Sequence, residues 1–173
     1  MNRSLVFTLV FLFALPAAAT SIQWAASKGD DGGDVRRGSF TVTDAECAYR
    51  SMADPVLMGR ILEHLERVDV HKDDGTYQDV TLAERFFLVG LVESRYDRTI
   101  DGRSRLEWQL TSGRQARHDG FWQVTPAASG GATVTFENLI QAKSRLHQPL
   151  LRKIQNRTMD DIAAAIQTRC NPS

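Results

Sequence analysis

The chain of 173 residues carries 21 basic and 21 acidic residues, so its formal net charge is zero. Hydrophobic residues make up 42% and charged residues 24%, which is typical of a globular domain and excludes a disordered or collagen-like chain. Zero net charge argues against holding nucleic acid by bulk positive charge, so no nucleic-acid partner is expected. Two cysteines are too few for a disulfide-rich scaffold or a four-cysteine zinc site.

The first 19 residues have the three parts of a secretory signal peptide. Arg3 precedes an apolar run from Leu5 to Ala19, and small residues end this run where a signal peptidase reads them. The run is shorter than the roughly 20 apolar residues of a membrane-spanning helix. We therefore predict cleavage after Ala19 and a periplasmic or secreted protein. An uncleaved membrane anchor is the alternative.

Residues 20–37 are mostly polar and include the run GDDGGD at positions 29–34. Such a segment has little apolar surface to bury, so it predicts a flexible polar arm. One folded domain is then expected over residues 38–173.

The folded part is predicted to begin with a strand over residues 39–49 and a short helix over residues 55–65. Asp54 followed by Pro55 is typical of a helix start. The apolar residues that follow recur at three- and four-residue spacing and form one stripe that packs a core: Leu57, Met58, Ile61, Leu62 and Leu65.

From residue 67 to residue 142 the pattern changes to alternation of apolar and polar residues, with turn residues between the runs. Short loops and this period predict an antiparallel meander that is buried on one face. The expected strands cover residues 68–70, 77–87, 91–100, 105–111, 118–125 and 132–140.

The chain is predicted to end in a helix over residues 149–169, about 30 Å long at 1.5 Å per residue. Cys170 falls on its apolar stripe, where it can meet Cys47 near the end of the first strand. An oxidising compartment allows these two residues to form a disulfide. Two separately buried thiols are the alternative.

A curved sheet that wraps around the terminal helix satisfies this order of elements. Residues 120–126 (GFWQVTP) and 130–136 (GGATVTF) combine a Gly-x-Trp strand, a Gly-Gly turn and a Thr-Val-Thr-aromatic strand, and Pro149-Leu150-Leu151 opens the last helix. Together these features resemble the START-like (SRPBCC) superfamily, which includes polyketide cyclase/dehydrase-like and coenzyme Q-binding proteins. The resemblance runs from about Ser39 to Cys170.

The resemblance implies an α+β helix-grip fold, in which a curved antiparallel sheet grips a long C-terminal helix and often leaves an elongated apolar cavity. Family members usually have a second small helix after the first. The segment between Leu65 and Val68 is too short for it, so the mouth of the cavity is expected to be trimmed.

Residues on the inward face of the strands are the candidate ligand-cavity residues: Phe86, Ser94, Tyr96, Trp108, Trp122, Phe136 and Asn138. The alternative is that the aromatic side chains simply fill a core. Glu84 falls on the same face, where a carboxylate is unfavourable unless it is paired, for example with Arg98, or bound to a ligand. Glu84 and Tyr96 are the candidates for acid/base catalysis.

The four histidines lack the spacing of a metal site, and no phosphate-binding, dinucleotide-binding or nucleophile-elbow motif is present, so neither a metal nor a cofactor is expected. The basic residues near the start of the last helix predict a solvated face, with peripheral contact to anionic lipids as the alternative: Arg145, Arg152, Lys153 and Arg157.

The prediction for function is therefore an exported protein that binds a hydrophobic small molecule, such as a lipid, a quinone or a polyketide-like compound. A cyclase/dehydrase-type enzyme that acts in the same cavity is one alternative. A non-catalytic interaction protein of the cell envelope, tethered by its polar arm, is the other.

Overall fold

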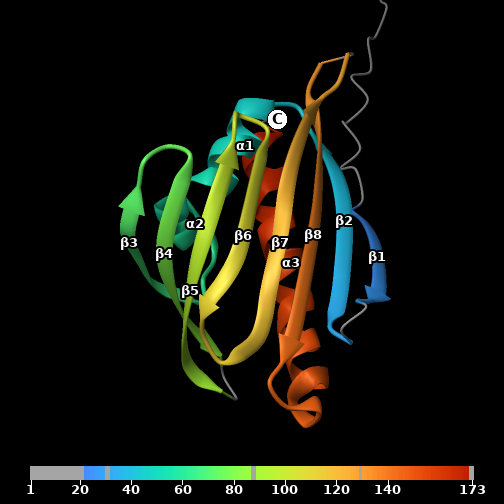
Figure 1. Ribbon diagram of the computed structural model, residues 1–173. Coiled ribbons are helices and arrows are strands. Elements are labelled where there is room, and N and C mark those ends of the chain that lie inside the picture. Colours follow the sequence, from blue (N-terminus) through green and yellow to red (C-terminus); the bar gives the residue numbers. More distant parts are fainter. Residues whose placement is uncertain (1–21, 30–31, 87–88, 129, 172–173) are drawn as a thin grey trace, which may run out of the picture.

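The computed structural model describes residues 22–29, 32–86, 89–128 and 130–171 (Figure 1). Within these residues, eight strands form one antiparallel sheet in the order β1-β2-β8-β7-β6-β5-β4-β3. The strands are β1 (Gln23–Lys28), β2 (Asp34–Val42), β3 (Leu65–Asp73), β4 (Tyr77–Phe86), β5 (Gly90–Asp101), β6 (Arg105–Ser112), β7 (Gln115–Pro126) and β8 (Ala132–Ala142). The helices are α1 (Ala45–Ala53), α2 (Pro55–Ile61), the 3-10 turn η1 (Arg145–His147) and α3 (Gln148–Cys170).

Helix α3 lies along one face of the sheet, where it packs against β2 and β8 (Figure 1). Its buried side chains include Met159, Ile162, Ala163 and Ile166, which recur at helical spacing and pack with the inward residues of the sheet. The α+β helix-grip fold predicted from the sequence is therefore confirmed. No helix of the described segments has the length and apolar character needed to cross a membrane.

The meander from β3 to β8 matches the alternation in the sequence. Each strand pairs with its neighbour along the chain. The longest ladders join β4 to β5 through ten residue pairs and β7 to β8 through eleven. Residues Val92, Ser94, Tyr96, Arg98 and Ile100 of β5 are all buried, whereas the residues between them are more exposed. This period of two places one face of the sheet toward α3.

The predicted flexible arm over residues 20–37 is wrong, because most of it forms the edge hairpin of β1 and β2. Strand β2 pairs with β8 along its whole length, and β1 covers the outer edge of β2. Trp24 packs edge-on against Phe136 at 5.1 Å between ring centroids, and Arg36 lies over the Trp24 ring at 3.4 Å. Backbone pairing and one aromatic anchor order this segment despite its low apolar content.

A second correction concerns the two short helices. The strand predicted over residues 39–49 ends at Val42, and the expected helix over residues 55–65 ends at Ile61. Asp44 caps α1 by accepting from the Cys47 amide, and Asp54 caps α2 by accepting from the amides of the next turn. A second small helix is therefore present, so there is no longer a reason to expect a trimmed cavity mouth.

The predicted disulfide between Cys47 and Cys170 is confirmed, with the Cα atoms 5.5 Å apart. It joins α1 to the last turn of α3, and not the end of a strand as expected. Beside it, the Asp44 amide donates to the Cys170 carbonyl oxygen at 3.2 Å. The C-terminal end of α3 is thus attached to the N-terminal end of α1 by a covalent bond and by a hydrogen bond.

Candidate functional site

A cavity of about 780 Å³ lies between the sheet and α3. Side chains from α2, from strands β4 to β8 and from α3 line it. Most of the lining is apolar, and Phe86, Trp108 and Trp122 contribute aromatic surface. A cavity of this volume with mostly apolar walls is typical of sites that bind small molecules.

The structure divides the predicted cavity residues into two groups. Phe86, Tyr96, Trp108, Trp122 and Asn138 line the cavity, whereas Ser94 and Phe136 do not. The Ser94 hydroxyl donates to Gln115 Oε1 at 3.4 Å. Phe136 packs between Trp24 and Trp122 and fills the space beneath Gly38, where a Cβ atom would lie 2.2 Å from the Phe136 ring. The aromatic side chains therefore fill a core at the β2 side and surround a cavity at the β5 side.

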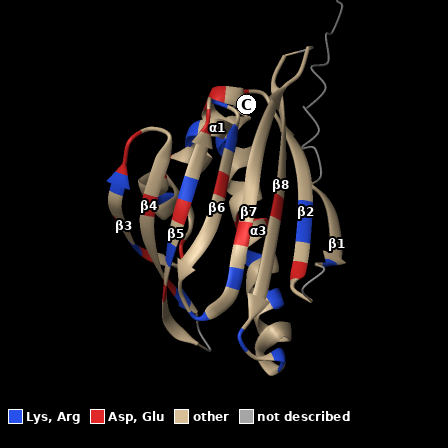
Figure 2. Cartoon of the chain, viewed as in Figure 1, with Lys and Arg blue, Asp and Glu red and all other residues tan. Residues whose placement is uncertain are grey.

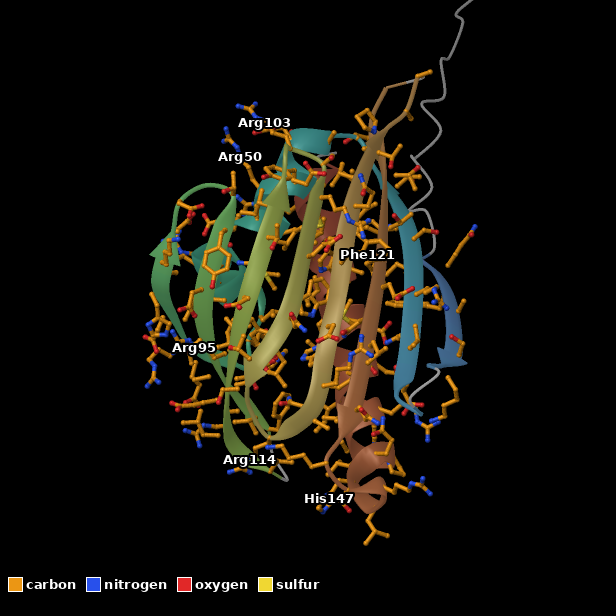
Figure 3. The ribbon with its side chains drawn as sticks, in the orientation of Figure 1. Arg50, Arg95, Arg103, Arg114, Phe121 and His147 are labelled. Carbon is orange, nitrogen blue, oxygen red and sulfur yellow. A yellow bond between two sulfur atoms is a disulfide. The ribbon has the colours of Figure 1, made fainter. Side chains whose placement is uncertain are left out.

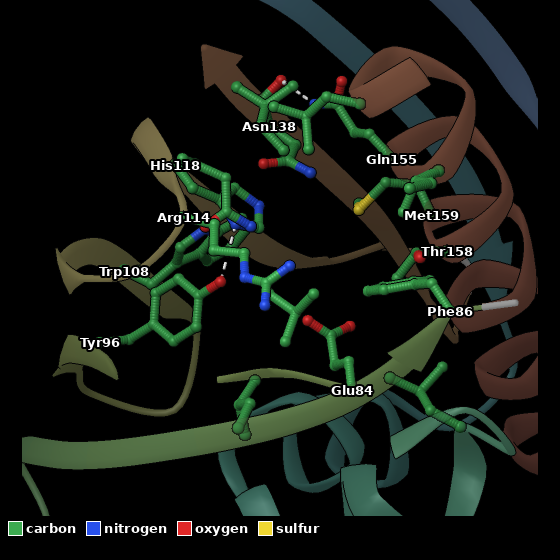
Figure 4. A pocket seen from close by; sticks show the side chains of 18 of the residues that line it. Glu84, Phe86, Tyr96, Trp108, Arg114, His118, Asn138, Gln155, Thr158 and Met159 are labelled. Atoms are coloured by element: carbon green, nitrogen blue, oxygen red, sulfur yellow. Dashed lines mark hydrogen bonds between the residues drawn. The ribbon is translucent and has the colours of Figure 1, made fainter. Parts of the chain in front are cut away.

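Tyr96 and His118 form a hydrogen-bonded pair in the cavity wall, with Tyr96 Oη 2.8 Å from His118 Nδ1 (Figure 4). Burial raises the pKa of Tyr96 above its usual range, and the nearby charge of Glu84 acts in the same direction. Burial lowers the pKa of His118, although Glu84 opposes this shift. Both groups are therefore uncharged at neutral pH. They can hydrogen-bond a ligand or exchange a proton with it.

His118 was predicted to be the first residue of the strand over residues 118–125, and it was not among the predicted cavity residues. Strand β7 begins at Gln115 and not at His118, so His118 already lies within the ladder. It shares its face with Gly120, Trp122 and Val124, and this alternation is the signal in the sequence that places it inside.

Glu84 lines the cavity, but its partner differs from the predicted one. Its Oε1 lies 3.3 Å from His64 Nε2 on the loop after α2. Arg98 lines the same cavity but lies farther along the sheet, because β4 and β5 pair Glu84 with Val92, and Arg98 with Gln78. The expected Glu84–Arg98 pair is therefore absent.

Arg98 is buried at the other end of β5. Its guanidinium donates to Gln78 Oε1 at 2.8 Å and to the Met52 carbonyl oxygen at 2.5 Å. Burial lowers the pKa of Arg98 to about 10, so the side chain stays charged at neutral pH. A cation at the last turn of α1 also complements the partial negative charge of that helix end.

Arg114 and Gln155 line the cavity and were not predicted from the sequence. Arg114 lies in the turn between β6 and β7, and Figure 4 shows its guanidinium reaching toward the space between Tyr96 and Glu84. Gln155 lies on α3, where its Nε2 donates to the Asn138 carbonyl oxygen at 3.0 Å. A turn arginine and a polar residue on an amphipathic helix carry no periodic signal that marks them as inward. Among the described residues, no group of acidic, histidine or cysteine side chains can hold a metal ion.

A family model described as polyketide cyclase/dehydrase and lipid transport matches residues 43–167, well over half of the chain. The chain belongs to this family. Proteins of the polyketide cyclase/dehydrase and lipid transport family bind hydrophobic small molecules, in agreement with an apolar cavity under the last helix. A search of curated proteins found no match to the chain.

Solved structures support the fold of this family member. An aromatase/cyclase, ZhuI from Streptomyces sp. R1128, superposes with a TM-score of 0.68 at 12% identity, covering 85% of this chain and 92% of that one. The lipid transfer and protein localization domain of human StarD13 gives 0.68 at 16% identity, covering 88% and 85%. A START superfamily protein from Mycobacterium smegmatis gives 0.68 at 11% identity, covering 80% and 97%. At these identities the likeness establishes the fold and leaves the ligand open.

Proposed function

We propose that this protein is an exported binding protein that holds a hydrophobic small molecule between its sheet and α3. The observation that carries the proposal is the cavity of about 780 Å³, whose walls are mainly apolar and aromatic. Transfer of an apolar ligand from water into such a cavity is favourable in proportion to the apolar surface area that is buried. A lipid, a quinone or a polyketide-like compound fits this description.

A variant that fills the cavity tests the proposal. Thr158 lines the cavity on α3, whereas Asp161 on the same helix is exposed. We expect wild type and Asp161→Trp to bind the apolar dye N-phenyl-1-naphthylamine in a fluorescence titration, and Thr158→Trp to lose most of this binding. Native mass spectrometry of gently purified protein shows whether a natural ligand is retained. Absence of dye binding in the wild type, or equal binding by both variants, would contradict the proposal.

Export is the second part of the proposal. The predicted signal peptide, residues 1–19, lies outside the described residues. The Cys47–Cys170 disulfide supports an oxidising compartment, since such bonds are rare in the cytosol. Intact mass and N-terminal sequencing of the protein from cell fractions test this, with Thr20 as the expected first residue of the exported form. A mature protein that retains Met1 in the cytosol would contradict it.

A membrane surface is the proposed source of the ligand. Residues 143–153 contain two lysines and two arginines and no acidic residue, and Figure 2 shows basic residues around the start of α3. Leu146 is 89% exposed within this segment. Lys143 and His147 are exposed and also line the cavity, so the opening lies at this end. Basic residues around an exposed leucine fit an anionic lipid surface.

The enzyme alternative is favoured by one specific observation: Glu84, Tyr96, Arg114 and His118 all line the same cavity. Such groups can act as acids and bases on a bound carbonyl compound. Exchange of the α-hydrogens of 2-undecanone in D2O, followed by NMR, tests this chemistry. Acceleration by wild type that is lost in Glu84→Gln and Tyr96→Phe would support catalysis, and no acceleration would argue against it. The envelope interaction alternative loses its basis, because most of its proposed tether forms β1 and β2.

A further inference from the structure

Arg114 brings a positive charge without a counter-ion to the mouth of the cavity. It lies in the turn between β6 and β7, is exposed to solvent and lines the cavity. Figure 4 shows its guanidinium pointing inward, toward the space between Tyr96 and Glu84. Among the described residues, none forms an ion pair or a hydrogen bond with the Arg114 side chain. An unpaired guanidinium that faces an apolar cavity is placed to contact the head group of a ligand.

Lys143 brings a second positive charge to the same part of the mouth. It follows β8, is exposed and lines the cavity. Its Nζ donates to the carbonyl oxygen of Gly113 at 3.0 Å, and Gly113 directly precedes Arg114 in the chain. The β6–β7 turn and the end of β8 thus hold two cations near each other, and Lys143 forms no ion pair with a described residue. Like charges repel each other, so a bound anion at this point would be favourable.

The charges that line the cavity do not balance. Among the described lining residues, Glu84 is the single acidic side chain, and its Oε1 lies 3.3 Å from His64 Nε2. Arg98 also lines the cavity, but its guanidinium is already hydrogen-bonded within the protein, beside the end of α1. With histidines counted as neutral, the two cations Arg114 and Lys143 against the one carboxylate of Glu84 leave one positive charge in excess. A ligand with one negative charge balances it.

We propose that the ligand is an amphipathic anion, with an apolar chain between the sheet and α3 and a carboxylate held at the mouth by Arg114 and Lys143. The guanidinium fork of an arginine matches a carboxylate with two parallel hydrogen bonds, and a lysine adds a point charge. Because Arg114 points into the cavity, its partner is the head group of the bound molecule and not the membrane surface beside Leu146. This inference rests on the proposed function and specifies the ligand class of the same cavity.

Three probes of equal chain length and different charge provide the test. Isothermal titration calorimetry at about pH 7.5, without membranes, compares decanoate, which is negatively charged, with neutral decanol and positively charged decylamine. We expect wild type to bind decanoate about tenfold more tightly than decylamine. In Arg114→Gln, which removes the charge and keeps a polar side chain, the affinity for decanoate should fall about tenfold. The affinity for decanol should stay unchanged, because it reports burial of the chain alone.

Arg60→Gln is the matched control, because Arg60 is exposed on α2, likewise forms no ion pair with a described residue, and does not line the cavity. It removes the same net charge and should leave all three affinities at their wild-type values. Thermal unfolding followed by circular dichroism confirms that each variant is folded, and the wild-type comparison of decanoate with decylamine tests the inference even if Arg114→Gln is not.

Three results overturn the inference while the binding function stands. They are equal binding of decanoate and decylamine by wild type, the same change of decanoate and decanol affinity in Arg114→Gln, and an equal loss of decanoate affinity in Arg60→Gln. If none of the three probes binds to wild type, the proposed function itself fails.

Discussion

Cys47 and Cys170 are 123 positions apart in the sequence, yet their Cα atoms lie 5.5 Å apart and their side chains form a disulfide. The bond attaches the last turn of α3 to α1, at the end of the molecule opposite Arg114 and His147 (Figures 1 and 3). One end of the gripped helix is therefore anchored covalently, and the cavity opens toward the other.

Loss of this disulfide is expected to destabilise the protein. In the chain-entropy model, a bond that closes a loop of this length contributes about 4–5 kcal/mol. The double variant Cys47→Ala/Cys170→Ala should lower the free energy of unfolding by several kcal/mol in urea denaturation. Reductant should destabilise wild type and leave the double variant unchanged. A wild-type protein with two alkylatable thiols under non-reducing conditions would contradict the bond itself.

Gly38 is expected to tolerate no side chain, because Phe136 occupies the position of its Cβ. Gly38→Ala forces the Phe136 ring to move against Trp24 and Trp122. Overpacking of this kind typically costs about 1–3 kcal/mol, which urea denaturation measures. Ser39→Ala, on the next position of β2, is the control and should have a smaller effect. If Gly38→Ala is as stable as wild type, Phe136 is not held in the position described.

The buried His118 predicts a dependence of stability on pH. Burial lowers the pKa of His118 in the folded protein, so the unfolded chain binds a proton more readily. The stability that comes from the neutral ring is present above the unfolded pKa of about 6.5 and decreases as the pH falls below it. Free energies of unfolding measured at about pH 7.5 and pH 5 should differ more for wild type than for His118→Gln. An identical difference in the two proteins would show that His118 does not contribute.

The exposed leucine beside the cavity opening predicts binding to anionic membranes. In vesicle flotation, wild type should bind vesicles that contain phosphatidylglycerol and not vesicles of phosphatidylcholine alone, and added salt should weaken this binding. Leu146→Ser should reduce it. Val70→Ser is the matched control, since Val70 is another exposed apolar residue on β3, away from the basic segment. Equal flotation with both lipid compositions would argue against the proposed surface.

Much of the fold could be predicted because alternation and helical spacing follow directly from side-chain geometry. Trp108, Trp122 and Asn138 were placed inward by counting in twos along strands, and Cys170 was placed on the buried stripe of α3 by counting in threes and fours. Periodicity did not predict secondary structure where a segment is ordered by partners that are distant in the sequence. Residues 23–28 form a strand because β2 and Phe136 lie beside them, and no local pattern reports that.

The sequence by itself thus indicated the family, the faces of the strands and the gripped helix, since each depends on residue type and short-range spacing. The disulfide was predicted from the sequence with two separate thiols as the alternative, and the tertiary structure decided between them by bringing Cys47 and Cys170 together. Only the tertiary structure decided that Phe136 fills a core while Tyr96 borders a cavity, that Glu84 lies beside His64, and that Gln155 donates to the Asn138 carbonyl oxygen. Periodicity states toward which side a residue points. Whether another atom already occupies that space depends on how separate elements pack against one another.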